Sequence, residues 1–236
     1  MKDQPKRTVI LISGRGTNMS RLIEAAAEAG YPAEIAGVLS DTPDAPGLLY
    51  ASSRGIQTHV FPRSDYSSRE AHDGAIHAAL EELGAEIVCL AGYMRILTAR
   101  FVEKWQGRMI NIHPALLPSF KGLDTHRRAL DAGVRVHGCT VHFVTPEMDD
   151  GPIIAQAAVP VLVADTEETL SARVLKAEHQ LYPMALRLLA DDRVRMENGR
   201  ALYAGLHEDK NGLARLFSPT SWSEEIDLEA LARSTP

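Results

Sequence analysis

The sequence predicts a three-layer α/β/α fold in which helices cover both faces of a doubly wound, mostly parallel sheet. Two patterns support this fold class. Short apolar segments alternate with helical segments from Thr8 to Ile112, joined by brief connections that contain glycine or proline, and such alternation is typical of a parallel sheet. The later apolar segments 138–144 and 153–159 follow each other without a helix. We therefore expect an antiparallel extension at the C-terminal side of the sheet.

The first elements suit the binding of an anion. Residues 8–12 predict a buried strand, and the turn Ser13 to Asn18 leads into a helix predicted over residues 19–29. Glycines in the turn let backbone N–H groups approach a ligand, and the helix N-terminus carries partial positive charge, so a phosphate fits there. The turn lacks the third glycine of a dinucleotide fingerprint and the Gly-Lys-Ser/Thr of a P-loop. A phosphate site and an unliganded turn therefore remain equally open.

The alternation continues along the chain. The segment 87–91 is apolar throughout, as expected of a strand with helices on both faces. The loop 92–97 that follows it lies where ligands bind in open α/β sheets, beyond the carboxyl ends of the strands. The other predicted strands are 35–39, 58–61 and 109–112, and the other predicted helices are 47–54, 67–83, 98–105, 124–132 and 166–190.

The longest predicted helix has a recognisable start and an internal proline. Asp165 with Glu168 resembles a capping box at its N-terminus, and Pro183 is expected to kink or interrupt it. After the helix, residues 194–203 form a possible hairpin.

The sequence indicates one domain followed by a tail. We expect a single domain over residues 1–204, with a phosphate-binding half at about 8–105 and a catalytic half at about 106–204. The polar tail 205–236 has no role that we can assign, and it contains a short helix candidate at 225–231.

Composition excludes several classes of protein. The net charge of the 236 residues is −6, with basic residues scattered rather than clustered, which argues against a nucleic-acid-binding surface. No apolar run is long enough to cross a bilayer, and the one near the N-terminus is too short for a signal sequence. We expect a soluble cytoplasmic protein.

Neither the cysteines nor the histidines predict a metal site. Cys89 and Cys139 both fall in predicted strands, where small buried side chains are the simplest interpretation. The nine histidines show no metal-ligand spacing. We expect His142 to be a hydrogen-bonded core residue, with ligand contact as the less favoured alternative, and we expect His126 and His137 to be solvated.

The run Asn111-Ile112-His113-Pro114 is the strongest candidate for chemistry. In a strand, Asn111 and His113 share a face while Ile112 packs behind them. An amide donor beside an imidazole suits reactions of a carbonyl, although both side chains also fit a purely structural role at a strand end. The acidic connection 146–152 between the last two strands is placed to return to this pair.

Four motifs stand out along the chain: Ser13-Gly14-Arg15-Gly16-Thr17-Asn18, Ala91-Gly92-Tyr93-Met94-Arg95-Ile96-Leu97, Asn111-Ile112-His113-Pro114-Ala115-Leu116-Leu117-Pro118 and His137-Gly138-Cys139-Thr140-Val141-His142-Phe143. Together they resemble the motifs of the phosphoribosylglycinamide formyltransferase family, folate-dependent enzymes of purine biosynthesis. The resemblance extends from Val9 to about Tyr203. Asn-x-His-Pro with Leu-Leu-Pro marks formyltransferases in general, whereas the N-terminal turn and the segment 122–126 narrow the resemblance to this family.

The resemblance implies a Rossmann-like formyltransferase fold and a specific reaction. The formyl group of 10-formyltetrahydrofolate would pass to the amine of 5-phosphoribosylglycinamide, with Asn111, His113 and Asp149 as the catalytic trio. In such a reaction the Asn111 amide would stabilise the oxyanion. His113 would either transfer protons or stabilise the oxyanion as an imidazolium, and Asp149 would orient and support the ring.

The resemblance also implies contacts for both substrates. Without the resemblance, the sequence would suggest that Glu178 is a solvated helix residue and that Met94, Ile96 and Leu97 are ordinary core residues. The implied contacts of phosphoribosylglycinamide are Gly14, Arg15, Gly16, Thr17, Asn18 and Glu178, and those of the folate are Arg69, Met94, Arg95, Ile96, Leu97, Asn111 and Val144.

Two departures from the family pattern lie near the trio. Lys121 stands where family members commonly have proline, and Asp124 stands where histidine is frequent. The alternatives are another folate-dependent enzyme that transfers or hydrolyses formyl groups, and a catalytically silent folate or nucleotide sensor. We expect a monomer or a homodimer with small-molecule substrates and no metal.

Overall fold

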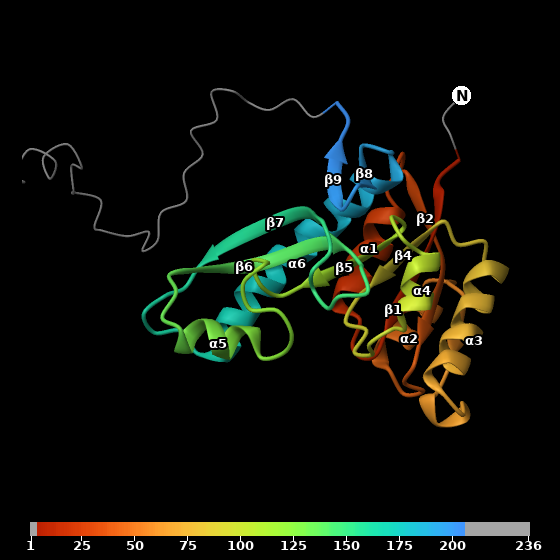
Figure 1. Cartoon of the computed structure of the whole chain (residues 1–236), viewed down its shortest axis with the longest axis horizontal. Helices are drawn as coiled ribbons and strands as arrows, with labels where there is room; N and C mark the ends of the chain where they lie inside the picture. The colour runs from red at the N-terminus through yellow and green to blue at the C-terminus, as the bar shows by residue number, and fades with distance from the viewer. Residues whose placement is uncertain (1–3, 206–236) are drawn as a thin grey trace, which may run out of the picture.

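The structure is a computed structural model that describes residues 4–205. Nine strands and seven helices, one of them a short 3₁₀ helix, occupy this part of the chain (Figure 1). The strands are β1 (Lys6–Ile12), β2 (Ala33–Ser40), β3 (Thr58–Val60), β4 (Ile87–Leu90), β5 (Met109–His113), β6 (Val136–Phe143), β7 (Ile153–Pro160), β8 (Val194–Glu197) and β9 (Arg200–Tyr203). The helices are α1 (Thr17–Ala26), α2 (Pro46–Ser53), η1 (Arg63–Asp65), α3 (Arg69–Glu82), α4 (Ala99–Lys104), α5 (Thr125–Asp131) and α6 (Glu167–Ala190).

The main sheet confirms the predicted fold class. Its seven strands have the order β3-β2-β1-β4-β5-β6-β7, with β1 to β5 parallel to one another. β6 is antiparallel to both β5 and β7, as the absence of a helix between the last two strands predicted. The strand order reverses between β1 and β4, and ligands in open α/β sheets bind beside such a switch point.

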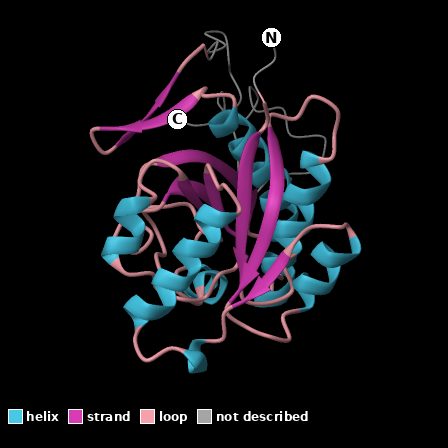
Figure 2. Ribbon diagram, turned by 90° about the vertical axis from the view of Figure 1, so that its right-hand side faces the viewer, coloured by secondary structure: helices cyan, strands magenta, loops and turns pink. Residues whose placement is uncertain are grey.

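Helices cover both faces of the sheet, as Figure 2 shows. On β1, Ile10 and Ile12 pack in one hydrophobic cluster with side chains of α1 and α6. Val9 and Leu11 pack in a second cluster with side chains of α3 and α4. Because neighbouring residues of a strand face opposite ways, a buried apolar run is what a strand between two helical layers requires.

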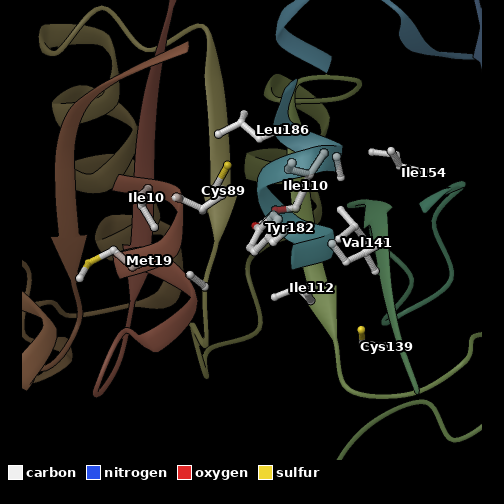
Figure 3. Packing of buried hydrophobic residues seen from close by; sticks show 14 of the residues in the cluster. Ile10, Met19, Cys89, Ile110, Ile112, Cys139, Val141, Ile154, Tyr182 and Leu186 are labelled. Carbon is white, nitrogen blue, oxygen red and sulfur yellow. Dashed lines mark hydrogen bonds between the residues drawn. The ribbon is translucent and has the colours of Figure 1, made fainter. Parts of the chain in front are cut away.

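Tyr182 joins the long helix α6 to two central strands. Its side chain is fully buried, and its hydroxyl lies 2.9 Å from the carbonyl oxygen of Leu90 and 3.1 Å from that of Ile110 (Figure 3). The hydroxyl proton is therefore shared between β4 and β5, one residue before Asn111. Burial raises the pKa of Tyr182 well above its ordinary value, so the phenol stays a donor.

The start and the middle of α6 differ from expectation. Thr166, rather than Asp165, is the N-cap, because its hydroxyl accepts from the backbone N–H of Thr169 and the Thr169 side chain accepts from the N–H of Thr166. Asp165 instead pairs with Arg173 at 2.6 Å. The helix also continues through Pro183, whose carbonyl accepts from the hydroxyl of Tyr31 at 2.6 Å.

Other helix boundaries shift by a few residues. α1 begins at Thr17, two residues before its predicted start, because Gly16 with φ 67° ends the preceding turn. Thr98 caps α4 as expected, since its hydroxyl accepts from Phe101 N–H. The helix candidate at 225–231 lies outside the described residues, and the division into one domain and a tail remains a prediction.

The hairpin β8-β9 confirms the predicted strand pair at residues 194–203. Asn198 and Gly199 form its two-residue turn with positive φ angles of 50° and 72°, and an Asn-Gly pair is the sequence most suited to that turn. Within residues 4–205, none of the helices has both the length and the apolar content that a membrane span requires.

We predict that Tyr182→Phe will destabilise the protein by about 1 to 3 kcal/mol, because two buried carbonyl groups lose a shared donor. Urea denaturation followed by circular dichroism measures the change. Tyr50→Phe is the control, since the Tyr50 hydroxyl bonds only partly buried Glu24 at 2.9 Å and its loss should cost less. Equal losses in the two variants would contradict the bridging role.

Candidate functional site

Asn111 and His113 lie on one face of β5, as alternation predicted. Ile110 and Ile112 point to the cluster under α6, so Asn111 and His113 point to the opposite face. β4 ends at Leu90, which pairs with Asn111, and His113 therefore extends past β4 and pairs only with Thr140 of β6. Loops rather than a helix cover His113 here, and they leave it 5% exposed.

The imidazole of His113 has a defined partner on each nitrogen. Nε2 lies 3.0 Å from the carbonyl oxygen of Phe120, and because a carbonyl only accepts, Nε2 carries a proton. Nδ1 lies 3.4 Å from Oδ2 of Asp149. Nδ1 is therefore the ring nitrogen that faces the Asp149 carboxylate.

The loop between β6 and β7 brings Asp149 back to His113, as the sequence predicted. Asp149 has a positive φ of 52°, and its Oδ2 accepts from the backbone N–H of Gly122 at 2.9 Å. At Gly151 the loop passes so close to β6 that an added Cβ would lie 1.7 Å from the carbonyl oxygen of Phe143. Glycine is therefore required for the return, which places Asp149 over His113.

An ion pair also holds the loop between β6 and β7. Lys121, one of the two departures from the family pattern, forms an ion pair with Asp150. Both side chains are substantially exposed to solvent, so the pair is worth at most about 1 kcal/mol. The lysine nevertheless lies on the segment that carries Gly122, so it adds a contact across the same two loops.

His142 joins the site, which sequence reasoning gave only as the less favoured alternative. Its Nδ1 donates to the carbonyl oxygen of Phe143 at 2.9 Å, which leaves Nε2 to accept from Nδ2 of Asn111 at 3.2 Å. Burial lowers the pKa of His142 and keeps the ring neutral, as an acceptor must be. The register that pairs Asn111 with His142 was the missing signal, and it fixes the direction of the amide.

His137 and His126 were expected to be solvated, and this prediction is wrong. His137 lies within β6 with 1% exposure, and His126 is partly buried. The two ring centroids are 5.4 Å apart, and the Phe120 ring lies 5.7 Å from that of His137. Burial lowers the pKa of His137 to about 4, so it stays neutral. These rings support the segment whose Phe120 carbonyl holds His113.

The glycine turn and α6 meet at a buried polar pair. Nδ2 of Asn18 donates to Oε2 of Glu178 at 2.7 Å, and Glu178 is only 7% exposed, contrary to the interpretation of a solvated residue. Oδ1 of Asn18 is buried without a hydrogen-bond partner among the described residues. Gly16 and Thr17 form the start of α1, and Arg15 is exposed. The turn thus presents an unused acceptor beside a carboxyl group.

In the loop after β4, exposed side chains alternate with side chains that point inward. Met94 and Ile96 are 69% and 61% exposed, so they are not core residues, whereas Leu97 is buried in the cluster with α3 and α4. The Arg95 side chain points inward and forms an ion pair with Asp73. Among the side chains of this group, those of Met94 and Ile96 are therefore the most exposed.

Helix α3 holds this loop from behind. The Asp73 carboxylate bonds Arg95 with one oxygen and accepts from the backbone N–H of Thr98 at 2.8 Å with the other. Arg69 donates to the carbonyl oxygen of Ile96 at 2.8 Å. Arg69 and Arg95, two of the implied folate contacts, thus also hold the loop in place. Val144 is partly buried against the same cluster.

The two candidate binding loops are joined to each other. The backbone N–H of Ser13 donates to the carbonyl oxygen of Gly92 at 3.1 Å, and the Ser13 hydroxyl accepts from the N–H of Met94 at 2.9 Å. They meet at the switch point between β1 and β4. No group of three possible metal ligands occurs within residues 4–205.

Comparisons with known proteins point to one family. The family model described as formyl transferase matches residues 6–186. Phosphoribosylglycinamide formyltransferase of Haemophilus influenzae is 41% identical over 209 residues, which are 89% of this chain and 99% of that protein. The trifunctional purine biosynthetic protein adenosine-3 of Bos taurus is 52% identical over 200 residues, 84% of this chain. The chain spans about a fifth of the length of such trifunctional relatives.

Solved structures show the same similarity. The phosphoribosylglycinamide formyltransferase of Brucella melitensis is 57% identical with a TM-score of 0.77, and the match covers 85% of this chain and all of that one. A formyltetrahydrofolate deformylase from Pseudomonas syringae pv. tomato is 28% identical with a TM-score of 0.79, covering 86% of this chain and 67% of that one.

We predict that the Glu178→Gln variant will lose less stability than the wild type as the pH rises. Burial raises the pKa of Glu178 above its ordinary value of 4.5, so the folded protein binds a proton that the unfolded chain releases. Stability from this group is full below the unfolded pKa and falls as the pH rises through the folded one. Glutamine keeps the bond to Asn18 and never ionises.

Melting temperatures measured from about pH 4 to pH 8 test this sign. The control is Glu24→Gln, because a hydrogen bond from Tyr50 lowers the pKa of Glu24 and its contribution is lost as the pH falls. A Glu178→Gln variant whose melting temperature follows the wild type across the whole range would show that Glu178 does not titrate abnormally.

Proposed function

Because the chain belongs to the formyl transferase family, we propose that it transfers the formyl group of 10-formyltetrahydrofolate to the amine of 5-phosphoribosylglycinamide. The product is formylglycinamide ribonucleotide, an intermediate of purine biosynthesis. The observation that carries the proposal is the contact of Asp149 with His113, on the same strand face as Asn111. Relatives that this chain covers almost completely are named for this reaction.

Asn111 is proposed to stabilise the oxyanion. When the amine attacks the formyl carbon, the carbonyl oxygen gains negative charge. One N–H of the Asn111 amide is engaged by His142, which leaves the second N–H for this oxygen. A preplaced side-chain donor of this kind lowers a barrier by about 3 to 4 kcal/mol, and its bond to a buried neutral histidine keeps it in place.

His113 is proposed to move the proton that the reaction releases. The attacking amine becomes an ammonium, and Nδ1 of His113 takes one of its protons as the new carbon–nitrogen bond forms. When the bond from the formyl carbon to the folate nitrogen breaks, the same proton passes to that nitrogen. The Phe120 carbonyl holds Nε2 throughout, and Asp149 stabilises the imidazolium between the two steps.

The substrates are proposed to approach from the two joined loops. The phosphate end lies at the turn Gly14 to Asn18, with Glu178 beside it. The folate lies against Met94, Ile96 and Val144, while Arg69, Arg95 and Leu97 support that wall. A monomeric or homodimeric cytoplasmic enzyme remains our prediction.

We predict that the purified protein will release tetrahydrofolate from the formyl donor only when phosphoribosylglycinamide is present. Absorbance of a folate analogue follows the release. The similarity to a deformylase makes hydrolysis the second candidate, but the loops leave His113 almost without solvent, which favours an amine acceptor over water. Release at the same rate without the amine would identify a hydrolase, and binding of both ligands without turnover would identify a sensor.

We predict that Asp149→Asn will lower kcat at least about a hundredfold, because the imidazolium of His113 loses its carboxylate. The asparagine oxygen still accepts from Gly122, so the melting temperature should change little. The control is Asp150→Asn, which removes the adjacent carboxylate. The partner of that carboxylate is the exposed side chain of Lys121. Equal rates for the two variants would remove Asp149 from the mechanism.

A further inference from the structure

We propose that Tyr203, which lies outside the main sheet on β9, is a positioning residue for Asp149. It acts through an irregularity at the start of β7, the strand that follows the Asp149 loop. The inference rests on the proposed function, since its consequence is a change in the transfer step.

The start of β7 contains a β-bulge. Val141 pairs with Ala155 and the next residue of β6, His142, pairs with Ile153, so Ile154 is an extra residue on β7. A bulge disrupts the ladder locally and changes the direction of its strand, and such features occur beside active sites, where they re-aim a side chain. This one lies beside the pair of His142 with Ile153, and its extra residue Ile154 comes two residues after Pro152, where the Asp149 loop ends.

Tyr203 supplies a hydrogen-bond donor to the bulge. Its hydroxyl lies 2.5 Å from the carbonyl oxygen of Ile154 and 3.3 Å from that of Ile153. β7 is the edge strand of the main sheet, so no further strand of that sheet holds its outer side. Tyr203 is 42% exposed as a whole, but desolvation of its hydroxyl raises the pKa, so the phenol keeps its proton. The hairpin β8-β9 follows α6 (Figure 1), and its Val194 packs in the cluster that contains side chains of α6.

The loop itself has little support on the side of the hairpin. A cavity of about 470 Å³ opens between them, lined by Leu117 and Pro118, by residues 149–153 of the loop and by residues 199–201 of the hairpin turn. Space rather than packed side chains thus separates Asp149 from the turn. At its exit the loop is held by the bond from Phe143 N–H to the Pro152 carbonyl at 2.9 Å and by the burial of Ile154. The bonds from Tyr203 to Ile153 and Ile154 add a tie on the side that faces the cavity.

The consequence concerns the distance between Asp149 and His113. At 3.4 Å the contact is close to the limit of a hydrogen bond, so a small displacement of the loop breaks it. A loop that drifts also loses the bond from Gly122 N–H to Asp149. The bonds described above do not connect the bulge to the turn Gly14 to Asn18 or to the loop that carries Met94. The loss of Tyr203 should therefore lower turnover rather than nucleotide binding.

The test compares Tyr203→Phe with Tyr50→Phe in the full chain. Both changes remove one phenolic hydroxyl and its bond to a backbone or side-chain oxygen, but Tyr50 bonds Glu24, on the other side of the fold. We expect Tyr203→Phe to lower kcat about five- to tenfold, because misplacement of a supporting group costs rate. We expect KM for phosphoribosylglycinamide to change less than about twofold, and amide hydrogen exchange in residues 145–152 to become faster. Tyr50→Phe should change none of these.

Three outcomes decide the matter. A kcat for Tyr203→Phe equal to that of Tyr50→Phe, measured well below both melting temperatures, overturns the inference. Unchanged hydrogen exchange in residues 145–152 also overturns it, because the loop is then not held by Tyr203. If the wild type shows no formyl transfer, the proposed function fails instead, and the exchange comparison still decides whether Tyr203 orders the loop.

Discussion

Asp149 meets His113 only because the chain crosses β6 at a point where no side chain fits. The Cβ that Gly151 lacks would lie within bonding distance of the Phe143 carbonyl oxygen, so the loop could not reach the strand face with any other residue there. From that crossing follow the position of the carboxylate, its bond to Gly122 N–H and its contact with Nδ1 of His113. The proposed proton transfer depends on this close backbone approach more than on any single charge.

The sheet explains why these polar groups gather where they do. The antiparallel pair β6-β7 extends the sheet past the reach of α3 and α4, so the face that carries Asn111, His113 and His142 is covered by loops. Under a helix, an imidazole and a carboxylate would be desolvated without room for a substrate. Here loops enclose the same groups, while α6 holds the opposite face through Tyr182.

Sequence reasoning recovered the architecture because its signals are local. Apolar runs, glycine turns and the Asn198-Gly199 pair act within a few residues, and the return of the acidic loop follows from two adjacent strands. The wrong predictions concern burial at long range. His137 was expected to be solvated, and only its packing against the His126 ring of α5 and the Phe120 ring shows that it is not. Glu178 looks like an ordinary polar residue of a helix when the family resemblance is left aside, and only the packing of α6 against α1 removes it from solvent. Likewise, the contact of His142 with Asn111 needs the strand register.

The buried polar groups divide into two kinds with different consequences. His137 and His142 are neutral because burial lowers the pKa of each, so they contribute shape and direction without adding charge beside His113. Glu178 is different, since burial raises its pKa and the Asn18 side chain of the glycine turn donates to it. A carboxyl group that holds its proton more tightly repels a phosphate less and donates to it more readily. Under the proposed function, the desolvation that weakens the fold at high pH therefore also suits this side chain to an anionic substrate.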